Sequence, residues 1–285
     1  PPRMRPPAFA ACEGYVPEAR PQNASRDIVG QDLDTILARD LITFAAYENF
    51  PPWSYLQDGQ PVGVDIEIGQ LIADTLGVKA RFDLLPAGET VEADLRNYIW
   101  QGPPTGGTVN NVMLHVPYDV NFACRVDQVV FTGQYAKESI AIAYNKADYP
   151  DDPPVPAYFR YDTVGVENDT IADFYLASIG NGMLIPKIAH YPTVALAMQG
   201  MADGEVMAVA GPRAQLQAGL TEAGDLHQPP LPGLSVGTWT IGLAVHTRYR
   251  YLGYAVDDAI RAALIDGRIA AIFAAHGLTF DAPLR

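Results

Sequence analysis

Two polar residues lie where a predicted strand gives way to the next element, and each could bind an anion. Thr170 begins a predicted helix directly after a strand, so its hydroxyl and the nearby backbone N–H groups face an anion naturally. Capping of that helix by Asp169 or Thr170 is an ordinary alternative, and both roles are compatible. Lys137 follows a long β-prone stretch and could bind a carboxylate or, as a neutral amine, add to an electrophilic carbonyl. A surface lysine is the alternative there.

Other catalytic and metal-binding patterns are missing from the sequence or lie in the wrong context. The five histidines show no metal-ligand spacing, and there is no C-x-x-C, H-E-x-x-H, Walker loop or dinucleotide glycine fingerprint. A G-x-S-x-G run at 233–237 precedes a strand-like segment, whereas the serine hydrolase motif needs a strand-to-helix elbow. No nucleophile is paired with a base. The sequence therefore predicts a binding protein with no required cofactor and no metal, not an enzyme.

Composition excludes several classes of partner. The formal charge of −14 argues against nucleic acid and anionic membrane surfaces, because both need basic footprints. No apolar run approaches the roughly 20 residues that cross a bilayer. We therefore expect a freely diffusing monomer with no membrane insertion.

The order of strand-like and helix-like segments predicts an α/β protein. Leu41–Tyr47 is continuously apolar, as in a buried parallel strand, and Gly63–Gly77 has apolar residues at helical spacing before a glycine stop. The alternation restarts at Thr163–Glu167. Two long extended stretches, Asp127–Asn145 and Ser235–His246, could carry the chain between lobes. The predicted domains are residues 41–136 with 236–285 as lobe 1 and residues 137–235 as lobe 2.

Residues 1–40 are rich in Pro and Arg, and we expect them to form an arm packed on lobe 1. This arm has no apolar signal-peptide core, so such a peptide was either removed or never present. Cys12 and Cys124 are the only cysteines. In a cytosolic protein they would be unrelated thiols, whereas in an exported protein an even pair indicates one disulfide between the arm and the body.

Four stretches, in this order, resemble the bacterial extracellular solute-binding proteins of family 3 over roughly Leu41–Leu278. They are Asn49–Tyr55 with Gly63–Glu67, Arg125 with Phe131–Tyr135, Val164–Thr170, and the last helices with Ala259–Leu264 and Asp266-Gly267. The resemblance implies the type II periplasmic binding fold, with two lobes of mixed sheet flanked by helices and two crossing strands. It also implies a periplasmic protein that closes on a ligand between its lobes and delivers it to an ABC transporter permease.

The resemblance also implies site residues. The family arginine at the position of Arg125 grips a ligand carboxylate, which suits a planar guanidinium. A structural salt bridge of Arg125 to Asp119 or Asp127 is the alternative. Amino-acid binders of the family place an Asp for the ligand ammonium after the strand equivalent to Val206–Ala210. Here Gly211-Pro212-Arg213 follows, so Arg213 would favour an anion, unless it is only an exposed residue of a helix's first turn.

Together these features predict a flat ligand with several carboxylates. Tyr47 or Trp53 could form an aromatic wall, with His115 and Glu167 as further candidates for ligand contact. Longer runs resemble binding proteins of bacteria that oxidise alcohols with quinoprotein dehydrogenases, which implies pyrroloquinoline quinone as ligand. The alternatives are an accessory protein of a periplasmic dehydrogenase, an amino-acid-binding protein, and a cyclohexadienyl dehydratase-like enzyme with Glu167 or His115 as general acid.

Overall fold

The computed structural model describes residues 31–285 and divides into two compact units. The first unit contains the described residues up to Ala136, then Thr240–Ile272 and Ala282–Arg285. The second unit contains Lys137–Trp239 and Phe273–Asp281. Lys137 thus begins the second unit, and Phe273–Asp281 belongs to that unit and not to the unit of the residues that precede it. Most of the predicted arm, and Cys12 of the predicted disulfide, lie outside the described residues.

The first unit is built on parallel strands. β1 (Leu41–Tyr47) lies between β4 (Lys79–Leu85) and β5 (Val112–Tyr118), and β5 pairs antiparallel with β11 (Thr238–His246), which neighbours β6 (Val129–Asn145). A short hairpin joins β2 (Tyr55–Gln57) to β3 (Gln60–Val62). The helical segments are α1 (Leu33–Arg39), α2 (Val64–Leu76), α3 (Val91–Leu95), the π-helical η2 (Arg96–Trp100), α4 (Val120–Arg125), the short η6 (Thr247–Tyr249), α8 (Arg250–Ile265) and α9 (Arg268–Ala275).

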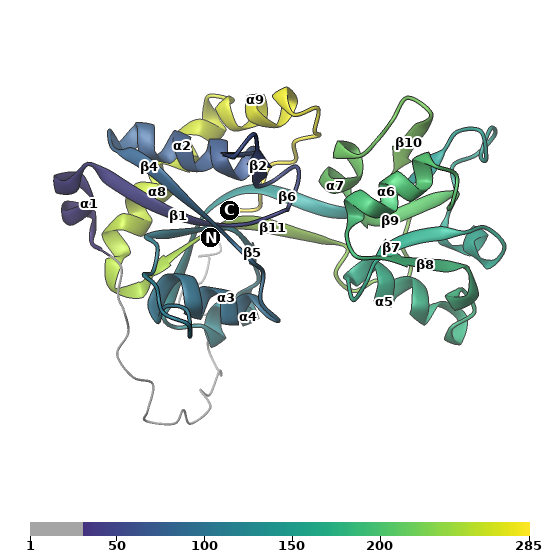
Figure 1. Ribbon diagram of the computed structural model, residues 1–285, viewed down its shortest axis with the longest axis horizontal. Helices are drawn as coiled ribbons and strands as arrows, with labels where there is room; N and C mark the ends of the chain where they lie inside the picture. The colour runs from purple at the N-terminus through teal and green to yellow at the C-terminus, as the bar shows by residue number, and fades with distance from the viewer. Residues whose placement is uncertain (1–30) are drawn as a thin grey trace, which may run out of the picture. The chain divides into compact units, whose positions relative to one another are not determined.

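Alternate residues of β1 face two cores. Ala45 packs with Leu95 and Trp100 from α3 and η2, whereas Phe44 stacks on Phe82 on the side of α2. In Figure 1, α2 and the α3–α4 pair accordingly lie on opposite faces of these strands. β1 is buried on both faces, which confirms the parallel strand predicted from its continuous apolar run.

α2 begins and ends where the sequence predicts. Gly63 precedes the helix with φ of 124°, a conformation open to glycine, and Gly77 ends it in the left-handed region. Asp65 and Glu67 place negative charge in its first turn, as the helix dipole favours. Asp65 is fully buried, however, so it has a further role.

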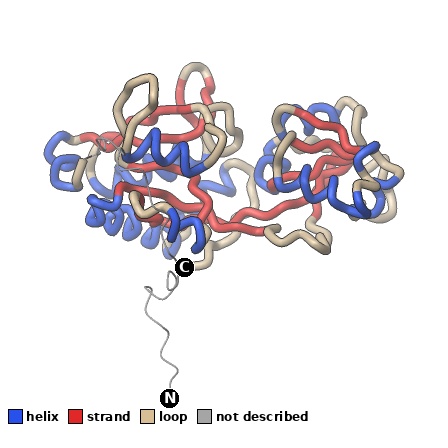
Figure 2. The backbone as a smooth tube through the Cα atoms, turned by 90° about the horizontal axis from the view of Figure 1, so that it is seen from below, coloured by secondary structure: helices blue, strands red, loops and turns tan. Residues whose placement is uncertain are grey.

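The second unit is a smaller mixed sheet. β6 pairs antiparallel with β9 (Ala208–Pro212), and β7 (Val164–Glu167) lies parallel between β9 and β8 (Ile188–Tyr191). β10 (Gly224–His227) covers the other edge of β6. Its helical segments are η3 (Pro156–Arg160), α5 (Ile171–Ser178), η4 (Ile179–Asn181), η5 (Ile185–Lys187), α6 (Val194–Ala202) and α7 (Arg213–Ala218). Helices lie on both faces of the strands (Figures 1 and 2).

Two strands belong to both units. β6 has 17 residues and changes unit between Ala136 and Lys137, and β11 does so between Trp239 and Thr240. The α/β class with two crossing strands is therefore confirmed. The sequence missed β8, β10 and the β2–β3 hairpin, which are three or four residues long and carry little periodic signal.

Candidate functional site

Arg125 lies at a pocket of the first unit. Arg125 is the last residue of α4. Its guanidinium carbon lies 5.9 Å from the centre of the Phe122 ring, within reach of a cation–π contact. The pocket has a volume of about 480 Å³ and is lined by Thr90, Val91, Glu92, Pro117, Asp119, Phe122 and Arg125.

The start of two helices and the end of one strand build this pocket. Thr90 caps α3 by accepting a 3.1 Å hydrogen bond from the N–H of Ala93. Asp119 caps α4 in the same way, accepting a 2.8 Å hydrogen bond from the N–H of Phe122. Capping side chains fix the direction in which each helix leaves the sheet. Two helix-capping residues that are recognisable in the sequence, Thr90 and Asp119, therefore help to shape the pocket.

The charges of the pocket are mixed. Arg125, Glu92 and Asp119 are all exposed lining residues, so two carboxylates accompany one guanidinium. A ligand with several carboxylates would meet repulsion from both acids, whereas a zwitterion or a cationic amino acid would find partners for both of its charges. Arg125 was predicted as a site residue and Glu92 was not, because nothing in the sequence shows that α3 and α4 begin beside one another.

His115 belongs to a buried polar group. It lies in β5, the strand that also carries Pro117 of the pocket. Its Nδ1 lies 3.0 Å from Oδ2 of Asp65, and the Tyr135 hydroxyl donates a hydrogen bond to Oδ1 of Asp65. Burial, and then the negative charge of Asp65, raise the pKa of Tyr135 well above its ordinary value, so its hydroxyl remains a donor. The imidazole packs edge-on against Trp53 and Phe50.

A bulge in β5 aims His115 at Asp65. Val116 pairs with Gly242 and Met113 with Ala244, so two residues of β5 face one of β11. His115 adopts φ of 57°, a left-handed conformation that is uncommon for a non-glycine residue. Bulges re-aim side chains, and this one turns the imidazole toward the buried carboxylate.

The two predicted aromatic residues are differently placed. Trp53 is 2% exposed, so its ring is a core side chain in contact with His115. Tyr47 is half-buried and its hydroxyl donates a 2.7 Å hydrogen bond to Oδ2 of Asp94. Burial, and then Asp94, raise the pKa of Tyr47 above its ordinary value. Neither ring lines the pocket of Arg125.

In the second unit, Glu167 and Thr170 lie together at the end of β7. The Thr170 hydroxyl donates a 2.8 Å hydrogen bond to the Glu167 carbonyl and caps α5. Oε2 of Glu167 accepts a 3.2 Å hydrogen bond from the N–H of Val194 at the start of α6. Burial raises the pKa of Glu167, and the bond from Val194 offsets part of this effect.

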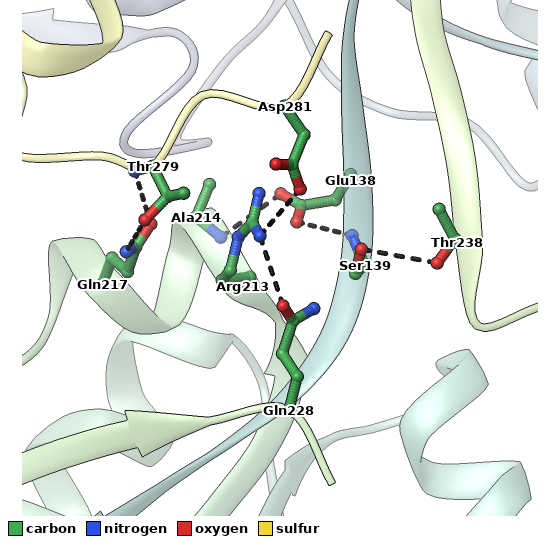
Figure 3. A network of polar contacts seen from close by, with 9 residues as sticks. All are labelled: Glu138, Ser139, Arg213, Ala214, Gln217, Gln228, Thr238, Thr279 and Asp281. Carbon is green, nitrogen blue, oxygen red and sulfur yellow. Dashed lines mark hydrogen bonds and ion pairs between the residues drawn. The ribbon is translucent and has the colours of Figure 1, made fainter. Parts of the chain in front are cut away.

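Arg213 and Lys137 of the second unit both contact Asp281 from the C-terminal segment. Nη1 of Arg213 lies 2.9 Å from Oδ2 of Asp281 (Figure 3). The main-chain N–H of Lys137 donates a 3.0 Å hydrogen bond to the Asp281 carbonyl. Arg213 is 6% exposed, so it is a buried, paired arginine and the exposed first-turn alternative is wrong. Asp281 was not predicted as a site residue, and no local signal in the sequence connects it to Arg213.

Within residues 31–285, no group of three or more His, Cys, Asp and Glu side chains is arranged to hold a metal ion. In the same part of the chain, no helix is long and apolar enough to span a bilayer.

Comparison with known proteins defines the class of fold. The family model for bacterial extracellular solute-binding proteins, family 3, matches residues 42–97, which run from β1 to η2. No curated protein sequence matches the chain. The fold is that of the periplasmic solute-binding proteins, as solved structures with the same architecture show.

Three of the solved structures that this chain is similar to have titles that name amino acids. An ancestral cationic amino acid solute-binding protein has a TM-score of 0.68 and 19% identity, covering 84% of this chain and 96% of its own. An amino acid ABC transporter substrate-binding protein from Streptococcus pneumoniae, bound to L-arginine, has a TM-score of 0.61 and 18% identity, with coverages of 88% and 100%. A second substrate-binding protein from that organism, with bound histidine, has a TM-score of 0.59 and 15% identity, with coverages of 85% and 94%.

Proposed function

We propose that this chain is an exported solute-binding protein that captures a small molecule with both a carboxylate and a cationic group and delivers it to an ABC-type permease. An amino acid, cationic ones included, is the ligand class that fits best. The observation that carries the proposal is the pocket in which Arg125 lies with Glu92 and Asp119. Arg125 would bind the ligand carboxylate and the two acids its cationic group.

The comparisons support the same ligand class. The similar structures bear titles that name cationic amino acids, L-arginine or histidine. This favours the amino-acid-binding alternative over the flat polycarboxylate expected from the sequence. The argument for a polycarboxylate relied on an unopposed charge at Arg213, and that guanidinium is paired with Asp281.

Calorimetric titration of the purified protein with L-arginine, L-histidine, L-glutamate and pyrroloquinoline quinone tests the proposal. We expect saturation at one equivalent by a basic amino acid. Arg125→Ala should weaken that binding about 10- to 100-fold, because a charge-assisted hydrogen bond contributes about 1.5–3 kcal/mol. Arg96→Ala is the matched control, since Arg96 is exposed in the same unit and does not line the pocket. Absence of binding by all amino acids would contradict the proposed ligand class.

Pyrroloquinoline quinone remains a second candidate. Its support is the buried guanidinium of Arg213 in the second unit, whereas Lys137 contacts Asp281 there only through its main-chain N–H. Saturation by the quinone alone, with a change in its absorbance that Lys137→Ala removes, would favour this ligand. A role as accessory protein to a periplasmic dehydrogenase has no observation in its favour among the residues described.

A dehydratase is a third candidate from another class. One similar structure is described as a precursor of cyclohexadienyl dehydratase. The raised pKa of Glu167 is the feature that a general acid would need. Product formation from cyclohexadienyl acids, abolished by Glu167→Gln, would support this activity, and unchanged substrate would exclude it.

A further inference from the structure

The Arg213 guanidinium is largely buried, and its Nε is a buried donor without a hydrogen-bond partner. Nη1 donates to Oδ2 of Asp281 at 2.9 Å and to Oε1 of Gln228 at 3.3 Å. A buried guanidinium requires an anion beside it, because desolvation of an unpaired charge is costly. This part of the second unit is therefore a position that some carboxylate must fill.

The carboxylate beside Arg213 belongs to Asp281, which lies in a C-terminal segment without regular secondary structure. Asp281 lies six residues beyond the end of α9, and its side chain is 39% exposed while that of Arg213 is 7% exposed. Two hydrogen bonds between Thr279 and Gln217, of 2.8 and 3.1 Å, hold the segment in place (Figure 3). The bond from Lys137 holds only the main chain of Asp281. The exposed Asp281 side chain can thus leave while the segment stays docked.

The other carboxylate near Arg213 is fixed. Glu138 is 3% exposed, and its two oxygens accept hydrogen bonds from the N–H groups of Ser139 and Ala214, at 2.8 and 3.2 Å. These main-chain donors anchor Glu138 inside the unit. Asp281 is therefore the exchangeable partner of the two.

We propose that Arg213 is a carboxylate receptor of the second unit. Asp281 of the same chain occupies this receptor, and the carboxylate of a small ligand competes with Asp281 for it. An incoming carboxylate gains the Nε–H donor that Asp281 leaves unused, and an arginine that offers two donors to one carboxylate binds it more strongly and with defined geometry. The C-terminal segment then acts as an internal competitor. Arg213 belongs to the second unit, whereas the Arg125 pocket belongs to the first unit.

Acetate titration of Asp281→Ala, followed by the Arg213 Nε–H signal in ¹H–¹⁵N NMR spectra, tests the proposal. Arg213→Lys assigns the signal by its loss. We expect acetate to shift the signal saturably in Asp281→Ala at a concentration at least tenfold below any response of the wild-type chain. Asp266→Ala, which breaks the exposed Arg268–Asp266 pair, is the control and should respond like the wild type. An equal response in the wild type and Asp281→Ala, or none in Asp281→Ala, would overturn the proposal.

A second pair of variants covers a failure of Asp281→Ala to fold. Asp281→Asn keeps the side-chain volume, and Thr279→Ala loosens the segment while keeping the Asp281 carboxylate. Both should respond to acetate at lower concentration than the wild type. Wild-type behaviour of both variants would show that Asp281 is a structural partner and not a competitor. Neither outcome changes the result expected for the Arg125→Ala titrations, so the proposed function and the Arg213 receptor can be contradicted independently of one another.

Discussion

The imidazole of His115 lies 3.0 Å from the carboxylate of Asp65, which has no exposed surface. The Tyr135 hydroxyl donates to the other oxygen of the same carboxylate. One buried acid from the first turn of α2 therefore joins β5 and β6. Because this acid and its two partners come from three segments distant in the sequence, the acid is expected to stabilise the first unit as a whole.

Asp65→Ala should lower the free energy of unfolding by roughly 3–5 kcal/mol, because it leaves a buried hydroxyl and a buried imidazole without their acceptor. Urea denaturation followed by circular dichroism measures the loss. Asp74→Ala is the control in the same helix, since Asp74 is exposed and its carboxylate accepts a hydrogen bond from the exposed Gln70. It should change stability by no more than about 0.5 kcal/mol. Equal effects of the two substitutions would show that the Asp65 network does not stabilise the unit.

Stability should fall with rising pH in the alkaline range. The pKa values of Tyr47 and Tyr135 are raised in the folded protein by burial and by neighbouring carboxylates. The unfolded chain loses these protons near pH 10 while the folded chain keeps them, so the stabilisation present below pH 10 is lost above it. Each tyrosine contributes a slope of about 1.4 kcal/mol per pH unit.

Denaturant titrations between pH 9.5 and 11 measure that slope. Tyr47→Phe and Tyr135→Phe should each reduce it by about 1.4 kcal/mol per pH unit. Tyr251→Phe, at a side chain that is 79% exposed, is the control and should leave the slope as it is. A slope that does not respond to either buried substitution would argue that these hydroxyls ionise in the folded protein.

Glu92→Gln should reduce affinity for L-arginine about two- to fivefold, because an exposed charge pair contributes roughly 0.2–1 kcal/mol. Affinity for an uncharged side-chain analogue such as L-glutamine should change less. Glu89→Gln is the matched control, since Glu89 is exposed in the segment before α3 and does not line the pocket. Calorimetry with both ligands provides the measurement. A loss shared equally by the two ligands would remove Glu92 as a determinant of specificity.

Gly63→Ala should destabilise the first unit severely, by roughly 3 kcal/mol or more. A Cβ at this position would lie 2.2 Å from the Trp53 carbonyl oxygen, and φ of 124° is unfavourable for any other residue. That carbonyl accepts the N–H of Asp65, so the start of α2 cannot move away without losing the bond. Thermal unfolding measures the effect. Gly59→Ala, at a left-handed residue with open space around it, should cost only about 1 kcal/mol.

Periodicity predicted most of the regular elements, because their patterns are local. The apolar run of β1 and the glycine-bounded helix α2 are examples, and both reflect burial against a neighbouring layer. Helix ends carry a weaker local signal. The segment Val91–Trp100 forms α3 and then the π-helical η2, and α7 has the six residues Arg213–Ala218. Tertiary packing sets such ends, since short helices have little stability of their own.

The sequence by itself determined the α/β class, the crossing strands and the start of α2. Each depends on residues that are neighbours in the chain or repeat with a fixed period. Only the tertiary structure decided which charges meet. Arg213 and Asp281 are brought together by the folding of the C-terminal segment onto the second unit, and Glu92 joins Arg125 because two helices begin at one pocket. Coulomb energy depends on distance in space, and distance in space between remote residues is not encoded in local sequence patterns.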